Sequence, residues 1–179
     1  EEAGFAPLRM DVLNKLAILE TLSDSDMVEQ QRQAMLDSRA PNASVEAILH
    51  AIIPFQYVDH THANAILALT NTENGLERVQ ELFGNRVIVI PYVMPGFALA
   101  KLVYDQTKDV SWEDYEGMVL MNHGIFTFSD NAKESYERMI LLVTKAEDYL
   151  GRAKALKPAL GQGACDPLEL ARLRKNVSD

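Results

Sequence analysis

The chain has 179 residues, of which 47% are hydrophobic and 24% are charged, a balance typical of one globular domain. Its formal net charge of -9 argues against a nucleic-acid partner, because binding to phosphates requires a basic surface. The apolar runs are short, so we expect no membrane span. The single cysteine, Cys165, excludes an internal disulfide, and we expect a cytoplasmic protein.

The first half of the chain is predicted to be mostly helical. Ser23, followed by acidic residues, indicates one helix start, and Ser44 can begin another helix that ends before Pro54. Apolar residues of the segment 1–22 follow no clear period. We expect helices over residues 23–36, 44–52, 62–70 and 74–83, and a short strand over 56–59.

The second half adds strands whose apolar residues are continuous, which indicates burial on both faces of a sheet. We expect strands over residues 86–90, 117–121 and 125–128, and helices over 95–104 and 129–150. Residues 151–179 are interpreted as a C-terminal linker and a short helix. The whole chain, 1–179, is therefore predicted to be a single domain of the α/β class.

Three of the four histidines lie where predicted strands end. His60 and His62 alternate in Asp59-His60-Thr61-His62, so both rings should point to one side, and His123 lies in Met121-Asn122-His123-Gly124. Three imidazoles without a nearby thiol suit zinc or another divalent ion, and an open fourth position would make the site catalytic. Chance occurrence of a His-x-His pair is the alternative that the residues alone leave open.

The residues around these histidines resemble the class II aldolase/adducin family. The resemblance lies in Tyr57-Val58-Asp59-His60-Thr61-His62-Ala63-Asn64-Ala65 and in Val119-Leu120-Met121-Asn122-His123-Gly124-Ile125. The segment Pro91-Tyr92-Val93-Met94-Pro95-Gly96-Phe97 is similar to the subgroup of rhamnulose-1-phosphate aldolases that are fused to an alcohol dehydrogenase. The family implies a three-layer α/β/α fold with a central, mainly antiparallel sheet.

The resemblance also implies a site and a reaction. His60, His62 and His123 would bind Zn²⁺ or another divalent metal, and Glu46 would be the catalytic acid/base. Without the resemblance, Glu46 is more simply interpreted as a solvated residue in the first turn of a helix. His50, one turn later, is interpreted as a packing residue. The reaction would be aldol cleavage of a sugar-phosphate substrate such as rhamnulose 1-phosphate. The family implies a homo-oligomer, expected to be a tetramer. A neighbouring subunit can supply a tyrosine to the active site, and Tyr92 is a candidate.

Two features of such enzymes are missing from the sequence. There is no glycine-rich phosphate loop and no dinucleotide-binding loop, so we expect a piece of a longer protein and predict no bound NAD. A sugar-phosphate 4-epimerase of the same family and a non-catalytic, adducin-like module are the alternative functions, and a third alternative is that this piece is itself inactive without the phosphate loop of its parent enzyme. The three histidines argue against the second, because adducin-type domains lose the metal ligands.

Overall fold

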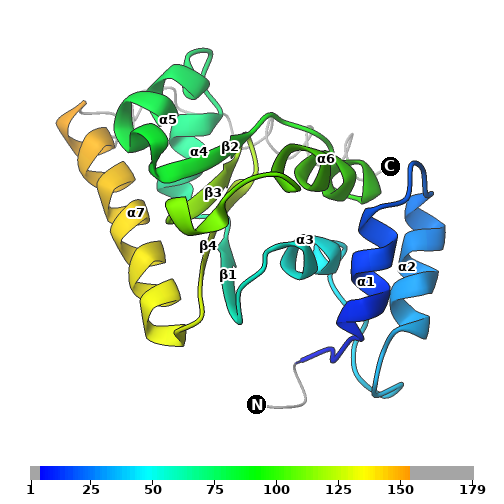
Figure 1. Ribbon diagram of the computed structural model, residues 1–179. Helices are drawn as coiled ribbons and strands as arrows, with labels where there is room; N and C mark the ends of the chain where they lie inside the picture. Colours follow the sequence, from blue (N-terminus) through cyan, green and yellow to red (C-terminus); the bar gives the residue numbers. More distant parts are fainter. Residues whose placement is uncertain (1–4, 154–179) are drawn as a thin grey trace, which may run out of the picture.

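The computed structural model describes residues 5–153, which form a four-stranded sheet with helices on both faces (Figure 1). The helices are α1 (Met10–Ala17), α2 (Asp24–Gln33), α3 (Ala47–Ile52), α4 (Asn64–Thr70), α5 (Gly75–Phe83), α6 (Phe97–Thr107) and α7 (Ala132–Arg152). The strands are β1 (Tyr57–Thr61), β2 (Val87–Ile90), β3 (Gly117–Leu120) and β4 (Gly124–Ser129). Short 3₁₀ turns lie at Gly84–Arg86 and Trp112–Asp114. The linker and helix predicted over 151–179 lie almost entirely outside the described residues.

The sheet is mixed, with the strand order β1-β4-β3-β2. β4 runs antiparallel to both β1 and β3, and a tight turn joins β3 directly to β4. β2 and β3 are parallel. The parallel pair follows from the crossover through α6, which carries the chain back to the same end of the sheet. The mainly antiparallel sheet is therefore confirmed, with one parallel pair that the sequence did not predict.

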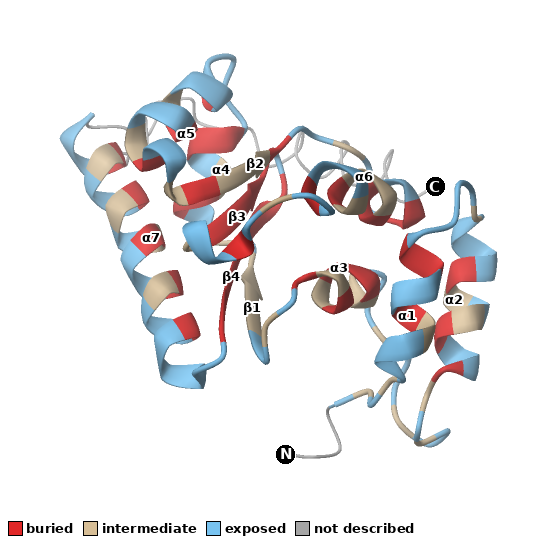
Figure 2. Cartoon of the chain, in the orientation of Figure 1, coloured by how far each residue is buried: buried red, intermediate tan, exposed pale blue. Residues whose placement is uncertain are grey.

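Two hydrophobic cores lie on opposite faces of the sheet, as the buried residues in Figure 2 show. Side chains alternate along a strand, so Met118 of β3 packs toward α1, α3 and α6, while Val119 packs toward α4, α5 and α7. On β4, Phe126 and Ile125 divide in the same way. The expected three-layer α/β/α arrangement is confirmed.

Several helix boundaries differ from those predicted, each for a local reason. α1 lies in the segment that showed no clear period. Ser23 does cap α2, since the backbone N–H of Asp26 donates to its Oγ at 3.1 Å, but the helix ends at Gln33. Ser44 does not begin α3; its Oγ accepts from the backbone N–H of Glu46 in a turn before the helix.

Asn131, rather than Ser129 or Asp130, caps α7. Its side-chain oxygen accepts from the backbone N–H groups of Lys133 and Glu134, at 3.0 and 3.2 Å. α7 is the longest described helix, with 21 residues, and its charged residues are spread along its exposed face. Among the described residues, no helix combines the length and the apolar character that crossing a membrane requires.

Candidate metal centre

Three segments that are far apart in the sequence meet at one end of β1. β1 carries His60 and is followed directly by His62. In the antiparallel pair, Thr61 lies opposite Ile125, so the end of β1 is beside the β3–β4 turn that carries His123. Glu46 is the N-cap residue of α3, which covers the same face of the sheet. The strand register therefore explains why the two histidine motifs come together.

The four side chains form one cluster of donor atoms. Glu46 Oε1 lies 2.7 Å from His123 Nε2, 3.3 Å from His60 Nε2 and 4.0 Å from His62 Nε2. One donor atom from each residue lies within 4.8 Å of the others. The side chains of Glu46, His60 and His123 are largely buried, while that of His62 is 57% exposed. The cluster thus opens to solvent on the His62 side.

The structure fixes which nitrogen of His60 faces the cluster. His60 Nδ1 lies 3.0 Å from the carbonyl oxygen of Ile125, and a carbonyl can only accept a hydrogen bond. Nδ1 therefore donates to this carbonyl, and Nε2 is the nitrogen that faces Glu46. The ring also stacks on Phe126, with centroids 4.0 Å apart and 16° between the planes. Such outer contacts set the tautomer and the orientation of metal-binding histidines.

The β3–β4 turn depends on two residues with special backbone requirements. Asn122 has a φ of 58°, in the left-handed region that asparagine tolerates better than most residues. Gly124 allows close packing, because a Cβ there would lie 2.6 Å from the carbonyl oxygen of Thr61 and 3.0 Å from atoms of both His60 and His62. The Asn-His-Gly sequence thus presents His123 while leaving room for the other two rings.

The cluster fits a divalent metal ion by the chemistry of its donors. Glu46 Oε1 and His60 Nε2 are buried and make no hydrogen bond among the described residues, although buried polar atoms nearly always have a partner. Ligand atoms of a tetrahedral zinc site lie roughly 3.3 Å apart, given zinc–ligand distances near 2.0 Å. The separations from Glu46 Oε1, 2.7 to 4.0 Å, lie on either side of that spacing.

The protonation states also suit a cation. His123, and after it His60, hold the pKa of the Glu46 carboxyl well below its usual range, against the opposing effect of burial. The pKa of His62 is lowered by burial, and further by the neighbouring imidazoles of His60 and His123. A charged carboxylate and a neutral imidazole are the ligating forms of these groups.

The predicted residues are therefore brought together, and the structure adds Glu46 itself to the donor set. The sequence suggested an acid/base role for Glu46, not a position between the three imidazoles. His50 lies at the edge of the cluster, with its ring centroid 6.5 Å from that of His60 and 5.3 Å from that of Phe126. Tyr92 is 52% exposed and is not a core residue. The packing of Phe126 was not predicted, since a strand sequence does not show which ring its side chain meets.

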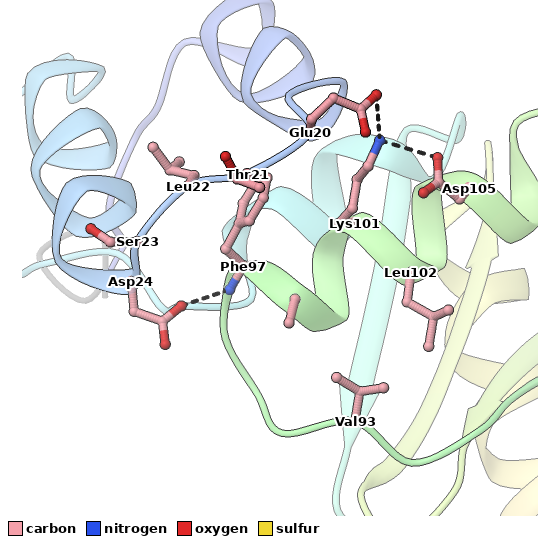
Figure 3. Close-up of a pocket in the computed structure, with 11 residues that line it drawn as sticks. Glu20, Thr21, Leu22, Ser23, Asp24, Val93, Phe97, Lys101, Leu102 and Asp105 are labelled. Carbon is pink, nitrogen blue, oxygen red and sulfur yellow. Dashed lines mark hydrogen bonds and ion pairs between the residues drawn. The ribbon is translucent and has the colours of Figure 1, made fainter.

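A separate cavity of about 730 Å³ lies between the α1–α2 connection and α6 (Figure 3). Its charged groups are engaged in protein contacts: Asp24 Oδ1 accepts from the backbone N–H of Phe97 at 2.8 Å, and Lys101 pairs with Glu20 and Asp105. None of its described lining residues is a histidine or a cysteine. The cavity is thus distinct from the histidine cluster, and its described lining offers no imidazole donor.

The chain belongs to the class II aldolase/adducin family. Residues 15–150 match the family model for the Class II Aldolase and Adducin N-terminal domain, a span that contains Glu46 and all three histidines. The matched region therefore includes the whole candidate metal centre.

Relatives and solved structures agree with this family. The N-terminal Class II Aldolase domain of a conserved protein from Thermoplasma acidophilum is 39% identical, with a TM-score of 0.75 over 84% of this chain and 68% of that one. A sugar-phosphate aldolase from Thermotoga maritima, 20% identical with a TM-score of 0.51, covers 69% of this chain and 59% of that one and shares the fold.

A curated relative is much longer than this chain. "Uncharacterized oxidoreductase YuxG" of Bacillus subtilis (strain 168) is 33% identical over 148 residues, which are 82% of this chain and 21% of that protein. The chain thus spans about a fifth of the length of this relative.

Proposed function

We propose that this chain carries the metal centre of an aldolase-type lyase, which cleaves a ketose 1-phosphate such as rhamnulose 1-phosphate to dihydroxyacetone phosphate and an aldehyde such as lactaldehyde. The observation that supports it most is the convergence of three histidine nitrogens and one carboxylate oxygen in a member of the class II aldolase/adducin family. His60, His62 and His123 would hold the ion with Glu46 beside it, and zinc suits three imidazole donors that leave a fourth position open.

The metal and the carboxylate would have separate tasks. A bound divalent ion supplies Lewis-acid polarisation of substrate oxygen atoms. Glu46, beside the histidines, would accept the proton that the C4 hydroxyl loses as the C3–C4 bond breaks, and would return this proton to carbon 3. Proton transfer by a positioned side chain contributes on the order of 10² to 10⁴ in rate.

Access to the centre supports this assignment. His62 is 57% exposed, whereas His60 and His123 are buried, so among the described residues the cluster is open to solvent on the His62 side. A structural metal site is closed by its protein ligands, while a catalytic site keeps an open side. This exposure favours catalysis over a purely structural metal site, and the complete donor set favours it over an adducin-like module.

We further propose that the chain works as a homo-oligomer, a tetramer, and in the cytoplasm. Tyr92 and Met94 are 52% and 68% exposed and follow β2 at the end of the sheet where His123 lies. Exposed apolar residues beside an open site are suited to contact a second subunit. Light scattering of the purified protein tests the tetramer.

The resemblance is to aldolases fused to an alcohol dehydrogenase, but we assign no dehydrogenase activity to these residues. The word oxidoreductase in the name of the Bacillus relative applies to a protein of which this chain spans about a fifth. We therefore propose that any such activity resides outside the aldolase region and that residues 5–153 bind no NAD.

Glu46→Gln tests the proposed reaction in the full-length protein. Glutamine keeps an oxygen atom near the histidines but accepts no proton, so we expect metal content to remain and release of dihydroxyacetone phosphate to fall by at least 10²-fold. Normal turnover by Glu46→Gln would refute the role of this residue. A wild-type protein that interconverts two sugar phosphates without releasing dihydroxyacetone phosphate would be an epimerase instead.

A further inference from the structure

The strand that carries His60 is at the edge of the sheet. β1 hydrogen-bonds to β4 on one side only, and its other side has no strand partner among the described residues. An edge strand has fewer restraints than a central one, because only one neighbour holds its backbone. A contact outside the ladder would add to the restraints on His60, and on His62 directly after β1, relative to His123.

A buried contact with α7 supplies such a restraint. Ser135 Oγ, in a side chain with no exposed surface, donates to Asp59 Oδ2 at 2.6 Å. Asp59 immediately precedes His60, and its side chain points to the opposite face of the sheet, as alternation requires. The hydrogen bond thus holds β1 from the α7 side at the residue next to the histidine.

A second hydrogen bond anchors the same serine to the neighbouring strand. Thr127 lies opposite Asp59 in the β1–β4 ladder, and its Oγ1 donates to the carbonyl oxygen of Ser135 at 2.9 Å. Thr127 and Ser135 are both fully buried. Ser135 is therefore fixed to β4 through its backbone and fixes β1 through its side chain.

We propose that Asp59 and Ser135 are positioning residues, which hold β1 in the register that lets His60 and His62 bind the same metal ion as His123. This inference rests on the proposed metal centre and adds residues that touch neither metal nor substrate. Outer residues that orient metal ligands typically change metal affinity by 10- to 100-fold when they are mutated.

The test is zinc affinity, measured by competition with a chromogenic chelator, for a set of variants. Asp59→Ala and Ser135→Ala should each raise the Kd about 10-fold, and the double variant should raise it no further, since both remove the same hydrogen bond. Asp59→Asn should stay close to wild type, because the amide oxygen can still accept from Ser135. The Co²⁺ absorption spectrum should change in the two alanine variants and not in Asp59→Asn.

Thr107→Val is the matched control, because it removes a buried hydrogen bond within α6, from Thr107 Oγ1 to the carbonyl oxygen of Val103, that involves neither β1, β4 nor Ser135. Its melting temperature should fall by about 2–4 °C while its zinc Kd stays unchanged. An equal loss of affinity in Thr107→Val would show general loosening and overturn the inference, as would wild-type affinity in Asp59→Ala. If the wild-type chain bound no metal at all, the proposed metal centre would fail first, and the inference with it.

Discussion

Gly124→Ala is the substitution with the most specific consequence at the metal centre. The added Cβ would lie 2.6 Å from the carbonyl oxygen of Thr61 and 3.0 Å from His60 Cε1 and His62 Cδ2. The first separation is about 0.8 Å short of ordinary van der Waals contact, and its partner is backbone rather than a flexible side chain. β1 must therefore move away from the β3–β4 turn, and both of its histidines must move with it.

The size of the effect follows from this displacement. Overpacking of a rigid site typically costs about 1–3 kcal/mol of unfolding free energy. A misplacement approaching 1 Å at a catalytic centre can cost on the order of 10² in rate. We therefore expect Gly124→Ala to unfold at lower urea concentration, to bind zinc at least tenfold more weakly, and to lose most of its aldolase activity.

Gly151→Ala is the control for the same change in composition. Gly151 lies in α7, and a Cβ there would meet no atom of the described residues within 4 Å. Alanine is favoured over glycine inside a helix, so this variant should be more stable by up to about 1 kcal/mol and should bind zinc normally. Urea unfolding and chelator competition measure both variants. Wild-type stability and zinc affinity in Gly124→Ala would refute the packing account of the turn.

Three further predictions concern pH, metal and the α6 terminus. Burial, and then His60, lower the pKa of His50, so at this residue the folded chain binds fewer protons than the unfolded chain. Without metal, the unfolding free energy of the chain should therefore fall as the pH drops from 7 to 5. His50→Gln should make the unfolding free energy less dependent on pH. A dependence of the opposite sign in urea titrations would contradict this. Zinc at 100 times its Kd should add about 2.7 kcal/mol to the unfolding free energy of the wild-type chain and nothing to His60→Ala, as measured by thermal or urea unfolding. Asp24→Ala, which removes the acceptor for the backbone N–H of Phe97, should lower the unfolding free energy by about 1 kcal/mol and leave zinc affinity unchanged.

Local signals in the sequence predicted much of the fold. The continuous apolar residues of β2 and β3 and the Ser23 cap of α2 identify elements that the structure contains, since each depends on neighbouring residues only. α1 was missed because its eight residues are too few to show a period against the apolar residues around them. The N-terminus of α3 was misplaced, because Ser44 can cap a helix or shape the turn before one.

The site could be predicted in its residues but not in its arrangement. His-x-His alternation indicated that the rings of His60 and His62 point to one side, and the structure agrees. The position of Glu46 between the imidazoles depends on how α3 packs on the sheet, which sequence spacing does not reveal. The hydrogen bond from His60 to the Ile125 carbonyl likewise depends on the β1–β4 register.

Metal stoichiometry tests the central claim most directly. The purified wild-type chain, saturated with zinc and passed through a desalting column, should retain one zinc ion per chain by elemental analysis. His60→Ala and His123→Ala should each retain almost none while keeping the wild-type circular-dichroism spectrum. Equal zinc content in the wild type and both variants, or a wild type that retains no zinc, would contradict a metal centre formed by His60, His62 and His123.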